Sequence, residues 1–540
     1  MPFSTGFEQG ALTTFALPAC HAAGPGYGGG MKILGHLFAF TALMVLLPAS
    51  ARAQAQAGGV FAIHFDEQHF PTGFSGDLIV AFSDPQAGEP RREMHRWFGA
   101  PPVMRIHVDA AAAGSELVVS HADARATYPG DWWDVEPKDW KVQAIARTSR
   151  VGRQAGLDEG DVFSAAQAVA YDSESSDVVH LNLDQVVGMR PFRETERVRL
   201  YEFESEALTR FHGFPYLIRA GVLLPEGYDP DQTYPVVYSI TGFGGTLDSV
   251  HRWAGMTPEG SPLGEAIVVV PDATNSYGHS VFCDSPSIGP WGTALVDEFA
   301  PAFDRDFGGA GPEHRYVTGV SSGGWSSLWL QVTYPDAFAG CWSHVPDPID
   351  FHDFQRIDLY TPLPDGSPRN MYSDASGAER EVARIQMETP ATYRDFVMHE
   401  NVLNPGGQIR SFEATFSPRN VDGSPRRVFD VKTGDIDHQV AEAWRPYDIS
   451  HTLLTNWNEL RGQLAGKIHV YAGEVDTFYL EGAVKRFQAA AQKAGMLDEM
   501  VVEVVPGMAH ELHGPGHAAM IETLSRAWAA RQQVAEPVGG

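Results

Sequence analysis

Apolar positions in the first half of the chain recur in short runs that turn residues separate. From residue 57 to residue 190 these runs have the length and alternation that predict β-strands. Their spacing is typical of a β-sandwich, so we expect an N-terminal all-β, immunoglobulin-like domain. No repeat of about 40–50 residues is present, which argues against a propeller. The predicted strands are 61–65, 78–82, 105–108, 116–119, 141–146 and 178–183.

The second half shows another pattern, in which continuous apolar runs alternate with helical segments. It begins near the sequence PFRETERV, residues 191–198, and extends to residue 540. Continuous apolar runs predict buried strands, and strands that alternate with helices predict an α/β fold. The predicted strands are 235–240, 316–318, 467–473 and 501–505, and the clearest helix is 480–494.

One long segment of this half, residues 347–456, has little regular periodicity and is rich in Pro, Gly and Arg. Long loops without secondary structure of their own usually carry function in compact domains. We therefore expect this insertion to carry function, and the resemblance set out below implies that it forms a cap over the pocket.

The sequence G-V-S-S-G at 319–323 stands where a predicted strand gives way to a predicted helix. A G-x-S-x-G turn bends sharply at such a point and exposes the serine oxygen at the helix N-terminus. The glycines let strand and helix pass closely, while the serine is held in a strained conformation. Ser321 is therefore the candidate nucleophile, and the backbone N–H of Ser322 is a candidate donor to an oxyanion.

Two further strand ends complete the order Ser, Asp, His along the chain. Asp476 and His510 each follow a predicted strand, where an α/β fold places its catalytic loops. In such a set the histidine takes the serine proton and the acid orients the imidazole. Glu474 remains an alternative acid, and His513 remains an alternative base.

A metal site is not expected at these histidines. The sequence HELH at 510–513 is one residue too short for the zinc helix motif, and Gly514-Pro515-Gly516 prevents a continuing helix. The pattern implies no cofactor and no metal.

A glycine-rich loop, TGFGG at 241–245, follows the predicted strand 235–240. Such a loop supplies the second oxyanion donor, because glycines let the backbone approach a substrate closely. The backbone N–H groups of Phe243 and Gly244 are the candidates, with Phe243 preferred.

These segments together resemble the putative-esterase branch of the α/β-hydrolases. That branch includes esterase D-like enzymes, feruloyl and acetylxylan esterases, enterochelin esterases and mycolyltransferases. The resemblance runs from about residue 194 to residue 531, and it implies an α/β-hydrolase fold and ester hydrolysis through an acyl-enzyme. One departure is Thr241, where many relatives carry histidine. The segments that carry the resemblance are TGFGG (241–245), GVSSGGW (319–325), GEVDTFYL (473–480) and PGMAH (506–510).

Aromatic residues in or near the motif loops are candidates to line the substrate pocket, namely Trp291, Trp325 and Tyr479. The alternative is that they pack the core. We expect a carboxylesterase, with feruloyl or acetyl esters of carbohydrates among the candidate substrates. A serine peptidase or an acyltransferase would use the same triad and stays an alternative, as does a binding protein with an inert hydrolase half.

The chain carries a net charge of −29. Nucleic acids and anionic membranes bind basic faces, so this charge argues against both as partners. The expected partner is a small-molecule or glycan-linked ester, and the sequence leaves the oligomeric state open.

Residues 31–53 predict a signal peptide. A positive start at Met31-Lys32 precedes the apolar run 33–47 and an A-x-A site, with cleavage expected after Ala53. The run is short for a membrane anchor, which remains the alternative. Residues 1–30 do not fit a signal peptide and are interpreted as an upstream extension. We expect a periplasmic or secreted protein that leaves the membrane after cleavage.

The mature chain would keep two cysteines, Cys283 and Cys341. An exported protein can pair them, but Cys341 lies in a predicted buried strand and can equally be a free thiol.

Overall fold

The structure is a computed structural model that describes residues 56–535 except 131–134, 257–261 and 386–390. The predicted upstream extension (1–30) and the predicted signal peptide (31–53) lie outside the described residues. The described residues belong to one compact unit. In the described ranges no helix is both long and apolar enough to cross a bilayer.

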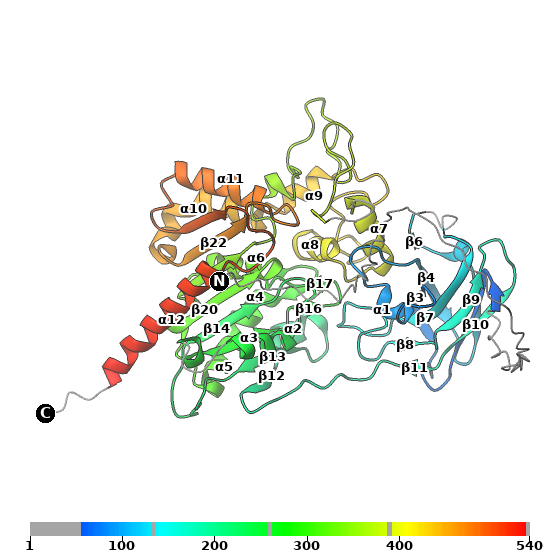
Figure 1. Ribbon diagram of the computed structural model, residues 1–540, viewed down its shortest axis with the longest axis horizontal. Coiled ribbons are helices and arrows are strands. Elements are labelled where there is room, and N and C mark those ends of the chain that lie inside the picture. Colours follow the sequence, from blue (N-terminus) through cyan, green and yellow to red (C-terminus); the bar gives the residue numbers. More distant parts are fainter. Residues whose placement is uncertain (1–55, 131–134, 257–261, 386–390, 536–540) are drawn as a thin grey trace, which may run out of the picture. The chain divides into compact units, whose positions relative to one another are not determined.

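Two β-sheets make up the first part of this unit, at the blue and cyan end of the chain in Figure 1. The smaller sheet has the order β10 (Val178–Leu183), β2 (Val60–Phe65), β5 (Glu116–Val119). The larger has the order β1 (Gln56–Gly58), β9 (Gln167–Tyr171), β7 (Lys138–Ala146), β3 (Phe74–Ser83), β4 (Val103–Ala111), β6 (Ala126–Tyr128). Strand β8 (Val162–Phe163) joins β7 to β11 (Gln185–Val186).

Both sheets contribute side chains to one apolar core. The ring of Phe61 from the smaller sheet lies 6.1 Å from that of Phe82, and Phe82 in turn contacts Trp140. All six strands predicted here are present, but β1, β6, β8, β9 and β11 were not predicted, since they are short or weakly alternating. An immunoglobulin-like connectivity stays a prediction.

The second part is built on a single eight-stranded sheet (Figure 1). Its first strand pairs are antiparallel, and all pairs from β15 to β23 are parallel. Parallel strands are buried on both faces, which explains why these segments read as continuous apolar runs. The order is β12 (Val198–Glu204), β13 (Leu217–Leu223), β15 (Ile267–Pro271), β14 (Val236–Ile240), β20 (Arg315–Val320), β21 (Gly340–His344), β22 (Ile468–Gly473), β23 (Val501–Val505).

Helices cover both faces of this sheet. Successive residues of a strand point to opposite faces, so Val236 and Val237 enter different apolar clusters. One face packs on α3 (Val250–Met256) and α12 (Gly514–Ala535), the other on α5 (Ala300–Phe307), α6 (Ser322–Thr333), α10 (Ile449–Leu464) and α11 (Glu481–Lys493). The structure therefore confirms the predicted α/β fold of this part.

The insertion is more regular than its sequence pattern predicts. It contains α7 (Tyr393–Leu403), α8 (Gln408–Phe416) and α9 (His438–Ala443), and α10 begins inside it. Side-chain caps rather than periodicity define these helices: the oxygens of Thr392, Asp437 and Asp448 accept N–H groups at the starts of α7, α9 and α10. The expectation of an irregular insertion was wrong because short, capped helices show little periodicity.

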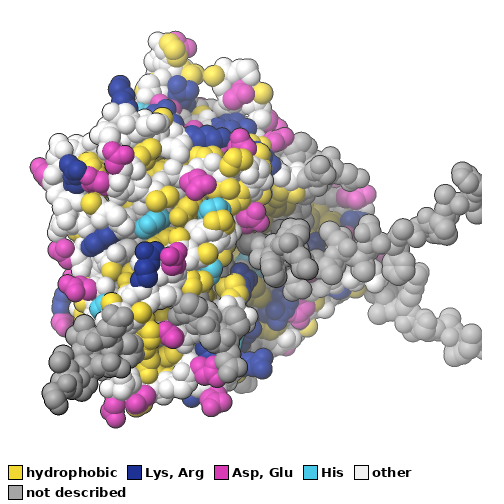
Figure 2. All heavy atoms as spheres, turned by 60° about the vertical axis from the view of Figure 1, so that its left-hand side comes forward, with side chains coloured by type: hydrophobic (Ala, Val, Ile, Leu, Met, Phe, Trp, Pro, Cys, Tyr) yellow, Lys and Arg dark blue, Asp and Glu magenta, His cyan; other side chains and the backbone are white. Residues whose placement is uncertain are grey.

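The remaining elements are short. They are α1 (Pro90–Glu93), α2 (Glu206–His212), α4 (Trp291–Thr293) and two small hairpins, β16–β17 (Thr274–Asn275, Gly278–His279) and β18–β19 (Asp284–Ser285, Gly289–Pro290). Cys283 and Cys341 are both buried and free. Acidic and basic side chains are interspersed on the face shown in Figure 2.

Candidate active site

Ser321 occupies the turn between β20 and α6 with a φ of 62°, a left-handed conformation that costs energy for a residue with a Cβ. Close packing explains the flanking glycines. A Cβ at Gly323 would lie 2.0 Å from the carbonyl oxygen of Ile240, and one at Gly319 would lie 2.2 Å from the oxygen of Gly323. The predicted strand–turn–helix geometry is present, and it holds the serine at the start of α6.

Asp476 and His510 come together from the loops after β22 and β23. His510 Nδ1 donates a hydrogen bond to Asp476 Oδ2 at 2.8 Å. The Asp476 carboxylate is fully buried and also accepts the N–H of Phe478 at 2.8 Å. A carboxylate fixed by two donors sets the orientation of the imidazole and leaves Nε2 for other partners.

The two alternatives from the sequence make other contacts. Glu474 is exposed and accepts the N–H of Gly507 at 3.1 Å. His513 Nδ1 accepts the N–H of Gly516, and its ring packs on Tyr471. In the described residues no cluster of His, Cys, Asp or Glu has the arrangement of a metal site.

The glycine-rich loop 241–245 lies directly against the serine. A Cβ on Gly242 would stand 3.2 Å from Ser321 Cβ and 3.9 Å from its Oγ. The N–H groups of Phe243 and Gly244 donate no hydrogen bond within the described part of the chain. The N–H of Ser322 is at the first position of α6, where a helix provides no acceptor. These three N–H groups are therefore free to face a substrate.

An arginine from the first part of the unit reaches this loop. The guanidinium of Arg153 lies 5.0 Å above the ring of Phe243, and its Nη2 is 3.3 Å from the position of a Cβ on Gly244. Burial lowers the pKa of the Arg153 guanidinium, whereas the nearby carboxylates of Asp158 and Asp272 raise it. The loop thus has a cation beside it that the sequence pattern did not indicate.

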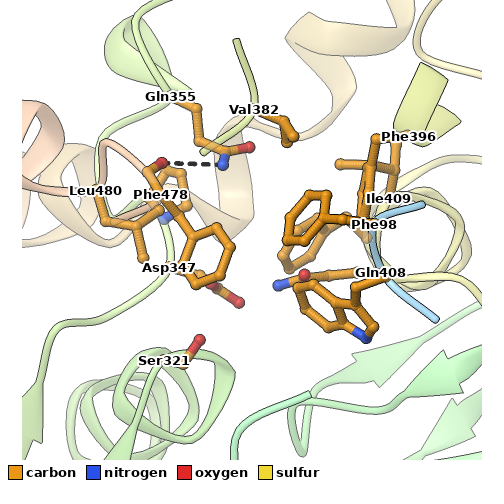
Figure 3. A pocket seen from close by; sticks show the side chains of 13 residues that line it. Phe98, Ser321, Asp347, Gln355, Val382, Phe396, Gln408, Ile409, Phe478 and Leu480 are labelled. Carbon is orange, nitrogen blue, oxygen red and sulfur yellow. Dashed lines mark hydrogen bonds between the residues drawn. The ribbon is translucent and has the colours of Figure 1, made fainter. Parts of the chain in front are cut away.

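A narrow cavity opens above Ser321 (Figure 3). Its volume of about 20 Å³ is room for little more than one water molecule. Any larger acyl group must therefore displace the side chains around it. The lining residues are Trp97, Phe98, Ser321, Asp347, Pro348, Gln355, Val382, Phe396, Gln408, Ile409, Phe412, Phe478 and Leu480.

Aromatic rings from distant segments form one wall of this cavity. Trp97, which follows α1, lies 5.9 Å from the ring of Phe243, 5.8 Å from Phe396 and 5.9 Å from Phe478. The ring of Phe478 in turn meets the His510 ring edge-on at 4.9 Å. We call Trp97, Phe98, Phe396 and Phe478 the aromatic wall.

The three aromatic residues proposed from the sequence do not line this cavity. Trp291 and Trp325 are buried in the core, where Trp325 stacks on Trp329. Residues of α6 are buried on all sides, so its tryptophans face the interior rather than the substrate. Tyr479 is also buried, with its hydroxyl donating to Glu381 at 2.9 Å.

Asp347 is the polar residue that the sequence pattern missed. It follows β21, and its Oδ2 accepts the hydroxyl of Ser322 at 2.5 Å, while its N–H donates to the Ser321 carbonyl at 3.3 Å. Burial raises the pKa of its carboxyl to about 6, although hydrogen bonds from Ser322 and Gln408 and the nearby His510 lower it. Its place after a parallel strand, at the edge where ligands bind, was the available signal.

The fold and the residues at these strand ends define a class of enzyme, the serine ester hydrolases. The family model described as "Putative esterase" matches residues 215–526, and the chain belongs to this family. The matched range contains Ser321, Asp476 and His510, and it confirms the resemblance predicted from the motifs.

Individual relatives are more distant. The chain is 28% identical over 176 residues to the putative esterase NocK of Nocardia uniformis subsp. tsuyamanensis. That alignment covers 31% of this chain and 48% of the relative, so it spans about half of the relative's length.

Two solved structures illustrate the likeness in three dimensions. An S-formylglutathione hydrolase from Agrobacterium tumefaciens is 12% identical, with 62% of this chain and 93% of the other covered at a TM-score of 0.35. A ferulic acid esterase from Anaeromyces mucronatus, solved with ferulic acid, is 14% identical, with 62% and 93% covered at a TM-score of 0.31. Likenesses at these scores say nothing about the substrate of this chain.

Proposed function

We propose that this enzyme hydrolyses carboxylic esters through a Ser321–His510–Asp476 triad. His510 accepts the Ser321 proton as the hydroxyl attacks the ester carbonyl, and Asp476 stabilises the imidazolium that forms. The alcohol leaves with the proton from His510, and water then cleaves the acyl-enzyme. The N–H groups of Ser322 and of Phe243 or Gly244 bind the oxyanion, and one such donor contributes roughly 3 kcal/mol to lowering the barrier.

The observation that carries this proposal is the 2.8 Å hydrogen bond from His510 to a fully buried Asp476. A buried carboxylate beside an imidazole is the arrangement that makes histidine an effective base. Ser321 supports the same assignment, because a left-handed serine at a strand–helix turn is a strain that nucleophile positions retain.

The proposal also covers the class of ester that the enzyme uses. An acyl group that inserts against the aromatic wall would gain apolar and ring contacts, which favours feruloyl esters of carbohydrates, while the small cavity volume favours acetyl esters. A serine peptidase or an acyltransferase would use the same triad, and the peptide anilide in the assay below separates a peptidase from a hydrolase of esters.

We also propose that the protein is exported and acts in the periplasm or outside the cell, from the signal-peptide pattern at 31–53. Expression of the full chain, fractionation of the cells and N-terminal sequencing test this. A mature N-terminus just after Ala53 is expected, and an uncleaved cytoplasmic protein would contradict export.

The direct test compares the wild-type protein with Ser321→Ala on p-nitrophenyl acetate, butyrate and octanoate, methyl ferulate and a peptide anilide. Ser376→Ala is the control, because Ser376 lies in an exposed turn. Loss of the nucleophile should lower kcat by at least about 10³-fold on every ester that is a substrate. Equal ester turnover by Ser321→Ala and wild type would refute the triad, and cleavage of the anilide alone would favour the peptidase.

A further inference from the structure

The cavity above Ser321 is lined mostly by apolar side chains, but one corner of it is polar. The side chains of Asp347 and Gln408 approach this corner from the loop after β21 and from the start of α8 (Figure 3). Asp347 is only 3% exposed, so its carboxyl faces the cavity rather than the solvent. A buried carboxyl beside a nucleophile needs partners, because desolvation of its charge is costly.

The described residues satisfy this carboxyl only in part. An ionised carboxylate has about four acceptor positions. The Ser322 hydroxyl fills one of them, and the Gln408 amide lies near enough to the carboxyl to lower its pKa (Figure 3). The remaining acceptor positions are open to a group that enters the cavity.

Gln355 offers a useful contrast in the same cavity. Its Nε2 donates to the carbonyl of Phe478 at 3.0 Å, and its Oε1 accepts the hydroxyl of Tyr393 at 2.9 Å. Both ends of this amide are engaged, so Gln355 holds the cavity wall together. Asp347 is the lining residue that combines burial, charge and unused acceptor capacity.

Asp347 lies next to the proposed oxyanion donors, so its unused hydrogen-bond acceptor positions can affect the reaction. Its Oδ2 bonds to the hydroxyl of Ser322, the residue whose N–H is proposed to bind the oxyanion. A negative carboxylate at that place opposes the negative charge that develops in the transition state. A substrate that brings a hydrogen-bond donor to Asp347 would reduce this repulsion.

We propose that Asp347 is a specificity-determining residue, which selects esters whose cavity-bound group carries a hydrogen-bond donor, a hydroxyl or an ammonium group. The inference rests on the proposed function of Ser321 as nucleophile. It adds a polar requirement to a cavity that is otherwise lined mostly by apolar side chains. An ammonium group gains both the hydrogen bond and charge neutralisation, so it is selected more strongly than a hydroxyl.

Three matched esters test the inference: p-nitrophenyl butyrate, 3-hydroxybutyrate and 3-aminobutyrate, with Ser321→Ala as the blank for spontaneous hydrolysis. Wild type should prefer the amino ester to butyrate by about tenfold or more in kcat/KM, with the hydroxy ester between them. Asp347→Asn removes the charge but keeps an acceptor, so it should lose the amino preference and retain part of the hydroxy preference. Asp374→Asn, in an exposed turn, is the matched control and should behave as wild type.

The outcomes separate this inference from the proposed function. Ser321-dependent turnover with equal kcat/KM for all three esters would overturn the role of Asp347 and leave the triad standing. If no ester is turned over, calorimetry is used instead to measure how tightly 3-aminobutyramide and butyramide bind to the full-length Ser321→Ala protein. Tighter binding of the amine supports the inference, and equal binding overturns it.

Folding of the Asp347 variant is checked by circular dichroism. If the Asp347 variant does not fold, the preference of wild type among the three esters still tests the inference. The variant Gln408→Met then provides a second test. This second variant removes the amide beside the carboxylate and should alter the amino preference by at least about threefold. An unchanged preference in Gln408→Met would count against the polar corner as the selecting element.

Discussion

The two sides of the candidate site are built in different ways. On one side Ser321, Asp476 and His510 stand on short loops at the ends of β20, β22 and β23, and a fully buried carboxylate fixes the imidazole by a hydrogen bond. On the other side, the rings of Trp97 and Phe396 come from segments outside the sheet. Trp97 is 37% exposed and is placed by ring contacts.

This difference separates chemistry from selection. On the first side Ser321 and Asp476 follow buried strands, and the hydrogen bond to Asp476 holds the His510 imidazole, so we expect this geometry to be the same for every substrate. Apart from Phe478, which lies in the loop after β22, the aromatic wall is joined to the sheet only through packing, and a cavity of about 20 Å³ must widen before an acyl group enters. We infer that substitutions on the first side change kcat for all esters, whereas substitutions on the second change which esters are used.

The largest effect is expected on the first side, for Asp476→Asn. The amide cannot hold His510 in the tautomer that Nδ1 donation requires, so kcat should fall by about 10³–10⁴-fold on all esters alike. The measurement is kcat on p-nitrophenyl acetate and octanoate. Glu474→Gln is the matched control, since Glu474 is exposed, and its kcat should stay within about twofold of wild type. The reverse ranking of the two variants would move the acid to Glu474.

A stability effect of similar size is expected for Trp325→Ala. The Trp325 side chain is 1% exposed and packs against Trp329 and Phe416, so its removal leaves a cavity in the core. The free energy of unfolding should fall by about 3–5 kcal/mol in urea titrations. KM for the folded variant should change little, because the side chain does not line the substrate cavity. A large change in KM with little loss of stability would restore Trp325 to the pocket.

A smaller and more selective effect is expected for Trp97→Ala on the aromatic wall. Loss of this half-exposed ring widens the cavity, so the ratio of kcat/KM for p-nitrophenyl octanoate to that for acetate should rise by about tenfold. The free energy of unfolding should change by less than about 1 kcal/mol. Trp97→Phe should fall between wild type and the alanine variant. An unchanged ratio would show that the aromatic wall does not select the acyl group.

The sequence alone predicts the first side well and the second side hardly at all. Glycines flanking a serine, and an acid and a histidine after strands, are local patterns with a fixed geometric meaning. The strands β14 and β22 were predicted within one residue and β20 as its central part, because buried parallel strands form continuous apolar runs. The partly exposed edge strand β23 was predicted from its run of valines. The order of the sheet then places their ends together.

The second side depends on contacts between residues far apart in the chain. Trp97 and Arg153 belong to the first part of the unit, and no local pattern connects them with the loop at 241–245. Trp325, which lies in the nucleophile motif, was a candidate for the pocket, but the close packing of α6 buries it. Proximity to a motif in the sequence is therefore a weak guide to which aromatic ring meets the substrate.

The smallest expected effect is a pH dependence that arises from Asp347, the residue at which the two sides of the site meet. Burial raises the pKa of this carboxyl from 3.8 to about 6, so it is neutral below that pH and negative above it. The negative form opposes the oxyanion, and the kcat/KM of wild type on an uncharged ester should then be lower than that of Asp347→Asn. The ratio of the variant to wild type on p-nitrophenyl butyrate should rise from near one at pH 5 to about threefold at pH 8, roughly 0.7 kcal/mol of repulsion.

Two other ionisable groups face Asp347, namely His510 and Asp476. Both are present in wild type and in the variant, so the ratio isolates the effect of the Asp347 carboxyl. The ratio of kcat/KM for Asp374→Asn to that for wild type should not change with pH. With the amino ester the Asp347→Asn ratio should fall instead of rise over the same pH range, because the ionised carboxylate then binds a cation. A ratio that is flat for both esters would show that the charge of Asp347 is not felt at Ser321, and that the two sides of the site act independently.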